Sequence, residues 1–344
     1  MQTMGEYLGA FSNYAFKVLA GPLDPNNRIY FLYLATSVFA AFFVYRAARK
    51  RNGEESFLRF LFPKHVWQHP SAWLDLRYFV FHSLIGHFLM LGLTAGATVV
   101  AFELVSGRPL IESVLREENA FSATDIAITA GYMVVSIVVV DFVSFLVHYM
   151  QHKLPILWQF HKVHHSAEVM HPISNFREHP VDNFLYKLMI GLSYGAVGGA
   201  AVSMFGYVPS VPSLLGVPLL MLVFNLLAYN LRHSHIWLRW PGRWSMILPS
   251  PAHHHIHHSC HPDHIDKNFA FMFPVWDVLF RTYCMPADNR DVKFGIGEGK
   301  AAELTTCLHL YAVPFRDAWR LIREDLRRFR QPRGASPAPA DAAS

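Results

Sequence analysis

The sequence has little charge and almost no cysteine. Only 16% of its 344 residues are charged, whereas soluble domains usually contain about 25%. The three cysteines, Cys260, Cys284 and Cys307, form no CxxC pair, so neither a disulfide framework nor a thiolate metal site is expected. A glycine fingerprint for nucleotide binding is also missing. The basic residues flank apolar blocks instead of forming a stripe, which argues against nucleic-acid binding despite a net charge of +5.

Apolar residues make up 52% of the chain and occur in long blocks. A helix needs about 20 apolar residues to cross about 30 Å of hydrocarbon. Five blocks approach or exceed that length, at 29–45, 78–105, 126–147, 184–208 and 211–231. The sequence therefore predicts an all-α integral membrane protein with about four to five transmembrane helices. The last two blocks would form a tight helical hairpin, and glycines at 191, 195, 198 and 199 would let helices pack closely.

The first apolar block ends in a basic run at 46–51, which the positive-inside rule places in the cytoplasm. If each of the five blocks crosses once, both histidine-rich parts of the chain, at 148–165 and 233–258, lie on that same face. We therefore expect a cytoplasmic, histidine-rich helical cap. The composition of the chain ends, rich in Ala, Arg and Pro, favours a bacterial source and hence the inner membrane.

The C-terminal part is basic and is interleaved with apolar residues at 316–333. This pattern predicts an amphipathic helix on an anionic membrane surface, although a solvated helix would show it too. The tail from 334 reads as disordered. The chain thus divides into an N-terminal segment with the first span (1–60), a membrane catalytic domain (61–285) and a C-terminal amphipathic helix with its tail (286–344).

Histidine is the residue in excess. The chain has 21 histidines, and 16 of them fall between His148 and His264. His148 and His152 are four residues apart at the end of the third block, so both imidazoles lie on one face of a helix. That is the arrangement expected of two ligands to one metal.

The motif H-x-x-H-H follows twice, and its histidines are His161, His164, His165, His254, His257 and His258. In the first copy we expect His161 and His164 to share a helical face, with the adjacent His165 turned by about 100° toward a different point. One segment can thus serve two neighbouring metals. A run such as 253–255 could instead be a metal-storage tract, but storage needs no partner motif a hundred residues upstream.

Two more histidines, His179 and His233, bring the candidate ligands to ten. Imidazole suits iron, zinc, copper and nickel, and a single zinc takes only three or four protein ligands. Nine or ten histidines fit two metals better. The Glu-x-x-His pairs of soluble di-iron bundles are missing, so the pattern predicts a di-metal site made almost entirely of nitrogen ligands.

Asp141 lies seven residues before His148 and therefore on the same helical face. A carboxylate within an apolar span is costly and suggests a function. We expect Asp141 to accept an imidazole N–H and so to fix the tautomer that leaves the other nitrogen free for metal. A hydrogen bond between two helices is the alternative.

These motifs resemble those of the sterol desaturase / fatty acid hydroxylase superfamily of membrane di-iron enzymes. The likeness extends over roughly 62–282 and is carried by the segment 141–166, by the Arg-x-His-Pro element at 177–180, by the later histidines, and by the closing segments at 268–269 and 276–282. The chain departs from the family pattern at Phe145, Tyr149, His235 and Arg281. His235 stands where the family often has Asn, so it could join or perturb the site.

The resemblance implies a pair of iron ions that use O2 and external electrons to hydroxylate or desaturate an aliphatic C–H bond of a lipid. Sterol, fatty acyl and ether-lipid substrates are all compatible with it. The electrons would come from a separate reductase, cytochrome b5 or ferredoxin, because the chain has neither a nucleotide-binding fingerprint nor a CxxC cluster motif. The lipid would reach the site from the bilayer.

Two readings from other classes stay open. A divalent-metal transporter or sensor would place histidines or carboxylates along several spans at mid-membrane, whereas these histidines cluster at span ends. A catalytically inactive membrane scaffold of the same fold is the other, although every presumed ligand position still carries histidine. Neither the lipid nor the choice between hydroxylation and desaturation follows from the sequence.

Overall fold

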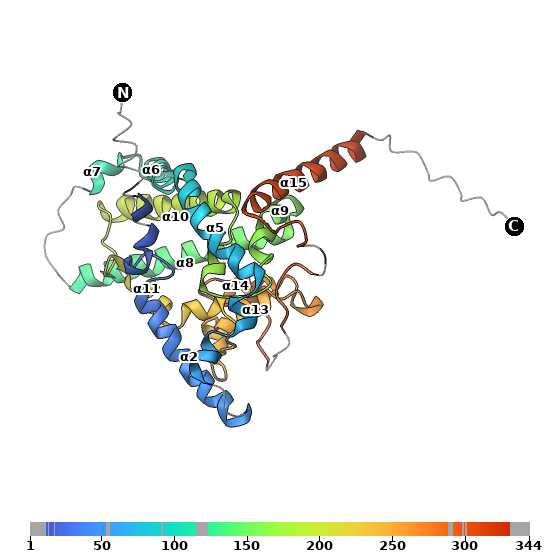
Figure 1. Ribbon diagram of the computed structural model, residues 1–344. Coiled ribbons are helices and arrows are strands. Elements are labelled where there is room, and N and C mark those ends of the chain that lie inside the picture. Colours follow the sequence, from blue (N-terminus) through green and yellow to red (C-terminus); the bar gives the residue numbers. More distant parts are fainter. Residues whose placement is uncertain are drawn as a thin grey trace.

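The computed structural model describes residues 12, 14–16, 18–52, 56–90, 92–114, 123–287, 292–297, 299 and 301–330 (Figure 1). The first half of this part contains η1 (Gly21–Leu23), α2 (Phe31–Asn52), α3 (Phe57–Leu61), α4 (Lys64–Trp67), α5 (Pro70–Met90), α6 (Leu93–Ser106), α7 (Leu110–Val114), α8 (Ala123–Lys153) and α9 (Pro155–His165). The second half contains η2 (Pro172–Phe176), α10 (Pro180–Phe205), β1 (Ser213–Leu214), β2 (Val217–Pro218), α11 (Leu219–Leu226), η3 (Tyr229–His233), α12 (Trp244–Ile247), α13 (Pro251–His257), η4 (Pro262–His264), α14 (Val275–Phe280) and α15 (Cys307–Arg330). The predicted helical class is confirmed, with one antiparallel two-residue strand pair added to it.

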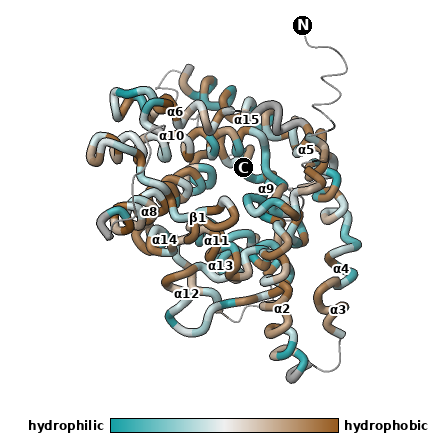
Figure 2. Tube along the Cα trace, turned by 90° about the vertical axis from the view of Figure 1, so that its left-hand side faces the viewer, coloured by the Kyte–Doolittle hydropathy of each residue, from teal (hydrophilic) through white to brown (hydrophobic). Residues whose placement is uncertain are grey.

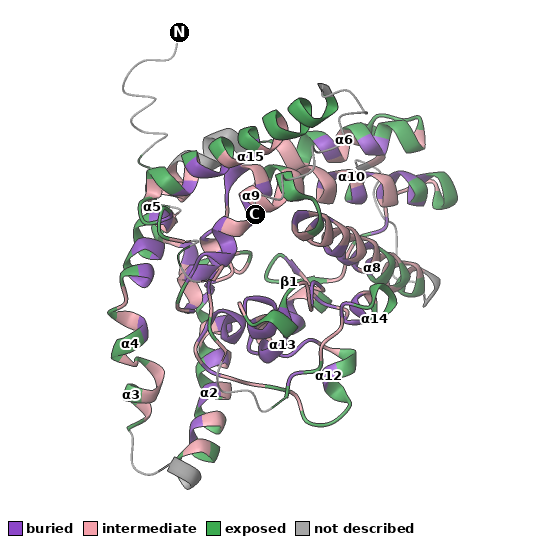
Figure 3. Cartoon of the chain, turned by 90° about the vertical axis from the view of Figure 1, so that its right-hand side faces the viewer, coloured by how far each residue is buried: buried purple, intermediate pink, exposed green. Residues whose placement is uncertain are grey.

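Three of the described helices are long and apolar enough to cross a membrane: Phe31–Arg49, Asp125–Lys153 and Pro180–Phe205. They are largely apolar in Figure 2, and much of their surface is exposed in Figure 3. Only 22%, 28% and 39% of their most apolar windows are buried inside the protein. Apolar helices that are mostly uncovered are expected where lipid supplies the surroundings.

The apolar block at 78–105 is not one helix, which corrects that prediction. α5 ends at Met90, and α6 begins at Leu93 after Gly92. Gly92 has a φ of 75°, a left-handed conformation that glycine adopts without steric cost and that interrupts a helix. α6 has 14 residues and is therefore about 21 Å long, shorter than the hydrocarbon layer.

The block at 211–231 also fails to form the predicted second arm of a helical hairpin. Its residues form β1 and β2, the eight-residue α11 and part of the 3-10 helix η3. Pro212 and Pro218 lack the N–H that a helix interior needs, and Gly216 has a φ of 73° in the turn between the strands. High hydrophobicity alone was therefore a poor guide to continuous helix here.

The predicted close packing by glycine is confirmed along α10. α6 lies against this helix (Figure 1), with Gly191, Gly195 and Gly199 facing its backbone. A Cβ atom at Gly191 would lie only 2.5 Å from the carbonyl oxygen of Thr94, so a larger residue would push the two helices apart.

The chain brings its two histidine-rich parts together at one end of α8 and α10. α9 follows directly on α8, and α10 begins soon after α9. The end of α8 and the beginning of α10 therefore lie near each other (Figure 1). After α10 leads away, the chain returns through β1, β2, α11 and η3 to His233. The two histidine-rich segments, 148–165 and 233–258, thus lie together as expected. The chain between α10 and His233, however, is not the single membrane span that we predicted at 211–231.

The C-terminal amphipathic helix is present as α15, and it begins at Cys307 instead of 316. Its first turns bury Leu310 and Val313 against Leu74, Tyr78 and Val163. Further along, the helix projects from the body (Figure 1). Trp319, next to the buried Ala318, is 58% exposed, and Phe329, near the end of the helix, is 90% exposed. The predicted disordered tail from 334 lies outside the described residues.

Candidate metal centre

Four elements supply the histidines of the centre. The last two turns of α8 carry His148 and His152, and α9 follows after Leu154, with Pro155 at its first position. α9 carries the first H-x-x-H-H motif, η3 ends at His233, and α13 carries the second motif. The fixed φ of proline suits the first turn of a helix, and both α9 and α13 begin with one. α13 is almost entirely buried (Figure 3).

The histidines form two groups. In each group, one ligand atom from every histidine lies within 4.8 Å of those of the others. The first, which we call the group of five, consists of His148, His152, His161, His165 and His257. The second, the group of four, consists of His164, His233, His254 and His258.

The two H-x-x-H-H motifs interlock these groups. In the first motif His161 and His165 join the group of five, and His164 crosses to the group of four. In the second motif the outer pair joins the group of four, and His257 crosses to the group of five. The prediction that one motif serves two points is confirmed. The expected pairing of His161 with His164 is wrong, because residues four apart lie closer on a helical face than residues three apart.

Hydrogen bonds on the outer side of the rings fix their protonation. The Nδ1 atoms of His148, His257 and His164 lie 2.8, 2.9 and 3.2 Å from the carbonyl oxygens of Phe269, Lys267 and Arg177. A carbonyl can only accept, so each Nδ1 carries the hydrogen. In a neutral ring the Nε2 atom is then unprotonated and presents a lone pair.

Several of the nitrogens that face the interior of the two groups lack a hydrogen-bond partner within the described part of the chain. The Nε2 atoms of His148, His161 and His257 are buried without a hydrogen bond. In the group of four, the Nε2 atom of His254 lies 2.9 Å from that of His233 and 3.0 Å from that of His258. Buried polar atoms without partners are costly, and converging lone pairs repel. A cation between them would satisfy both groups, so the residues fit one metal ion in each.

Burial keeps the rings in the neutral form that binds metal. Burial, reinforced by neighbouring imidazoles, holds the pKa values of His165, His257 and His258 well below the usual value of histidine. Burial also lowers the pKa of His164 to about 4. At neutral pH these side chains therefore need not lose a proton before they bind a cation.

Two carboxylates, missed in the sequence, lie behind the group of five. Asp182 Oδ2 is 3.4 Å from His161 Nδ1, and Asp266 Oδ1 is 3.4 Å from His152 Nδ1. Gln151 donates to the other oxygen of Asp182 at 3.1 Å. A carboxylate behind a ligating imidazole orients the ring and makes it more basic. No spacing in the sequence singles out these aspartates, because each meets its histidine only through the fold.

Asp141 does not meet a histidine, contrary to our expectation. It accepts hydrogen bonds from the backbone N–H groups of Met272 and Phe273, at 2.8 and 3.1 Å, and from the indole of Trp276 at 2.9 Å. Asp141 thus anchors the segment that follows Phe269, whose carbonyl accepts from His148. Its role in the site is indirect.

His179 and His235 lie outside both groups. His179 caps the N-terminus of α10, where its Nδ1 accepts from Val181 N at 3.1 Å, while its Nε2 donates to the carbonyl of Tyr311 at 3.1 Å. His235 Nε2 donates to the carbonyl of Phe60 at 2.8 Å. Of the ten candidate ligands, the structure therefore brings nine together and leaves out His179.

Comparison with known proteins agrees with this geometry. Residues 133–282, which contain all nine histidines, match the family model for fatty acid hydroxylases. This part of the chain is similar to enzymes of the fatty acid hydroxylase/sterol desaturase superfamily. It is 31% identical over 157 residues to the alkylglycerol monooxygenase of Homo sapiens, an alignment that covers 46% of this chain and 31% of the human protein.

A second relative is bacterial. The chain is 26% identical over 174 residues to the ornithine lipid hydroxylase OlsE of Rhizobium tropici, covering 51% of this chain and 48% of that protein. The alkylglycerol monooxygenase of Danio rerio is 30% identical over 154 residues, covering 44% of this chain and 30% of the fish protein. The chain thus aligns with about a third to a half of the length of these relatives. No solved structure matches it.

Proposed function

We propose that the protein is a membrane-bound di-iron oxygenase that uses O2 and external electrons to hydroxylate an aliphatic C–H bond of a lipid. The observation that carries the proposal is the pair of buried histidine groups whose unprotonated nitrogens converge on two points. The similarity of residues 133–282 to fatty acid hydroxylases supports iron as the metal in both groups. The names of the relatives, a monooxygenase and a hydroxylase, favour hydroxylation over desaturation.

Iron in these groups would supply the O2-dependent attack on a C–H bond, for which side chains have no chemistry of their own. The protein's share is to fix the ligands and to exclude water. Trp158 packs on His152 and His165, with ring centroids 5.0 and 5.4 Å apart. Phe269 packs on His152 and His257 at 4.8 and 5.6 Å. These two aromatic side chains exclude water from the group of five and limit rotation of its rings.

The substrate we propose is a lipid with a long aliphatic chain and a polar headgroup. Alkylglycerol and ornithine lipid, which the names of the relatives print, both fit this description. The apolar helices α8 and α10 end beside the histidine groups, so a lipid in the bilayer could lie along them with one methylene at the centre. Electrons would come from a separate donor, such as a reductase, cytochrome b5 or ferredoxin.

We also propose that the centre faces the cytoplasm, in a bacterial inner membrane. The basic run at 46–51 ends the first apolar helix, and basic residues are enriched on the cytoplasmic side. Within this proposal, 61–285 form the catalytic domain, 1–60 carry the first span, and 286–344 carry α15. How often the chain crosses the membrane is part of the same proposal, because the block at 78–105 is divided into α5 and α6 at Gly92.

The test is metal analysis of the full-length protein, purified in detergent, with three variants. His161→Ala and His257→Ala remove ligands of the group of five. His255→Ala is the matched control, because this neighbour on α13 donates from Nε2 to the carbonyl of Leu231 instead. We expect about two iron ions per chain in the wild type and in the control, and a loss in both ligand variants. Zinc, or iron retained in both ligand variants, would contradict the proposal.

Activity needs its own measurement. Cells that express the wild type should accumulate a lipid that is heavier by one oxygen atom, and growth under ¹⁸O2 should label that oxygen. Cells that express His161→Ala should lack this lipid. If the wild type holds iron but no lipid changes, a metal sensor, a transporter or an inactive scaffold becomes the better account.

A further inference from the structure

The group of four depends on the seven-residue segment 171–177, which contains η2. The Nδ1 atom of His164 donates to the carbonyl of Arg177 at 3.2 Å. The Nδ1 atom of His233 lies 3.0 Å from the hydroxyl of Ser174. That hydroxyl donates to the carbonyl of His171 at 2.8 Å, so it accepts from His233. Two of the four rings are therefore aimed by this one segment.

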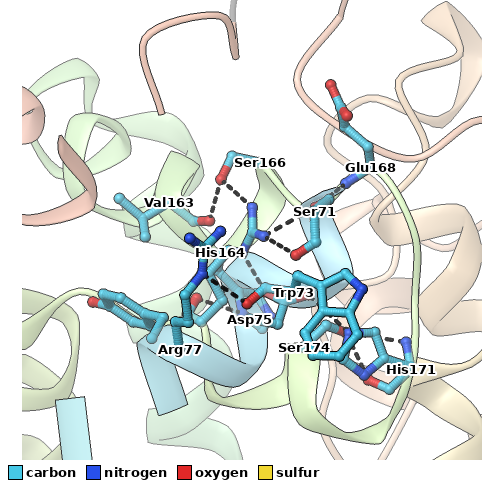
Figure 4. Close-up of polar contacts among 12 residues, drawn as sticks. Ser71, Trp73, Asp75, Arg77, Val163, His164, Ser166, Glu168, His171 and Ser174 are labelled. Atoms are coloured by element: carbon cyan, nitrogen blue, oxygen red, sulfur yellow. Dashed lines mark hydrogen bonds and ion pairs between the residues drawn. The ribbon is translucent and has the colours of Figure 1, made fainter. Parts of the chain in front are cut away.

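A single carboxylate on α5 fixes both ends of the segment (Figure 4). One oxygen of Asp75 accepts from Arg177 Nε at 2.5 Å, and the other lies 3.0 Å from His171 Nε2. The guanidinium also donates to the carbonyl and hydroxyl of Ser71, both at 2.9 Å, and to the hydroxyl of Ser166 at 3.2 Å. Asp75 is 1% exposed and Arg177 is 2% exposed. A buried and fully bonded pair of this kind is rigid.

Three rings of the group of five, those of His148, His152 and His257, have separate supports. His148 and His257 donate to carbonyls in the segment 266–269, and His152 faces Asp266. That segment is held by Asp277, which accepts from Phe269 N at 2.8 Å and from Ala270 N at 2.9 Å. None of these described contacts passes through Asp75 or segment 171–177.

We propose that Asp75 is a positioning residue for one half of the metal centre. By fixing His171 and Arg177 it aims His164 and His233, and therefore controls the affinity of the group of four without controlling that of the group of five. Asp75 lies outside residues 133–282, the part that matches the family model. The inference rests on the proposed function, since it presumes that each group holds a metal ion.

The experiment measures how much iron the purified full-length protein retains against a graded concentration of chelator. Loss of an outer partner usually weakens metal binding by about 10- to 100-fold. We therefore expect Asp75→Asn to lose one of two iron ions at about 10- to 100-fold less chelator than the wild type needs, while the second ion is retained as in the wild type. Asp277→Asn should weaken the other ion instead.

A milder variant guards against failure to fold, because Asp75→Asn leaves Arg177 as a buried charge without its partner. Ser174→Ala removes only the hydroxyl beneath His233, and it should release the same ion as Asp75→Asn. The matched control is Ser193→Ala, whose buried hydroxyl bonds the carbonyl of Met189 within α10; it should behave like the wild type. If Asp75→Asn does not fold, the metal content of Ser174→Ala alone decides whether segment 171–177 positions the group of four.

The outcomes separate the inference from the proposed function. A wild type that does not hold about two iron ions would refute the proposed centre. A wild type that holds two, together with a Ser174→Ala variant that loses both ions in parallel or neither ion early, would leave the centre standing and overturn the positioning role. If the two iron ions give separate spectroscopic signals, a change in only one of these signals in Ser174→Ala would support the positioning role directly.

Discussion

Replacing Gly195 by alanine should destabilise the protein, although alanine is the better helix former. Gly195 lies on α10 against α6, where an added Cβ atom would collide with the Thr98 carbonyl oxygen and lie 2.8 Å from the Cβ of Ala101. Real Cβ atoms do not approach other atoms so closely, and both obstacles are parts of a helix backbone or are fixed to it. The helices must separate, which loosens contacts on both sides of the glycine.

The size of the effect follows from two opposing terms. Overpacking a tight interface costs about 1–3 kcal/mol, while the change from glycine to alanine within a helix gains about 0.5–1 kcal/mol. The difference between the two ranges is centred on a net loss of about 1 kcal/mol and reaches about 2.5 kcal/mol, and it should appear as a drop of a few degrees in Tm in detergent. Tryptophan fluorescence or circular dichroism would record the transition.

The matched control is Gly96→Ala on α6. No described atom lies within 4 Å of a Cβ built there, so only the favourable helix term remains and Tm should stay constant or rise. Equal shifts in the two variants would show that close packing of α6 on α10 is not what Gly195 provides, and the reasoning would fail.

Other predictions concern residues outside the two histidine groups. His179→Asn should retain iron, because Asn also caps helix N-termini well. In the wild type, burial lowers the pKa of His179 to about 4, below the 6.5 of the unfolded chain, so its stabilisation is present above pH 6.5 and is lost as pH falls toward 4. Over that range urea denaturation should show a loss of up to about 3 kcal/mol that the Asn variant lacks, and an equal loss in both would refute it. Asp141→Asn should cost about 1–3 kcal/mol by weakening its bonds to Met272 and Trp276, and an unchanged Tm would contradict this. Trp319 on α15 should be quenched by brominated lipid in nanodiscs, more strongly with anionic than with zwitterionic lipid, and no quenching would favour a solvated helix.

The histidine motifs could be predicted from the sequence because their chemistry depends on local spacing. Helical geometry requires that residues four apart are neighbours, and the structure places His148 with His152 as expected. The error was in the motif at 161–165. Residues four apart are rotated by about 40° and residues three apart by about 60° in the opposite sense, so His165 and not His164 joins His161.

The partners of these histidines could not be predicted, because they come from distant parts of the chain. Asp75 and Arg177 are 102 residues apart in sequence. Arg177 belongs to the Arg-x-His-Pro element, but no local pattern pairs it with Asp75. Asp182 is only one of several acidic residues that begin a helix. Asp141 was misjudged for the related reason that helical periodicity predicts a face but not the segment that covers it.

Hydrophobicity predicted three helices that are long and apolar enough to cross a membrane, and it was a poor guide to the other two blocks. The blocks around α2, α8 and α10 lack internal proline and form continuous helices. The block at 211–231 has the same apolar character, yet Pro212, Gly216 and Pro218 divide it into strands and short helices. Backbone chemistry thus outweighed side-chain hydrophobicity where the two conflicted.

If the proposed function is right, the two histidine groups hold two iron ions in different surroundings. Mössbauer spectroscopy of the full-length protein, produced with ⁵⁷Fe, tests it most directly. In the group of five, carboxylates lie behind two of the rings, whereas in the group of four a carbonyl and a hydroxyl contact two of the rings. We expect about two iron ions per chain and two signals of equal area. One iron environment, or a chain that binds zinc instead, would contradict it.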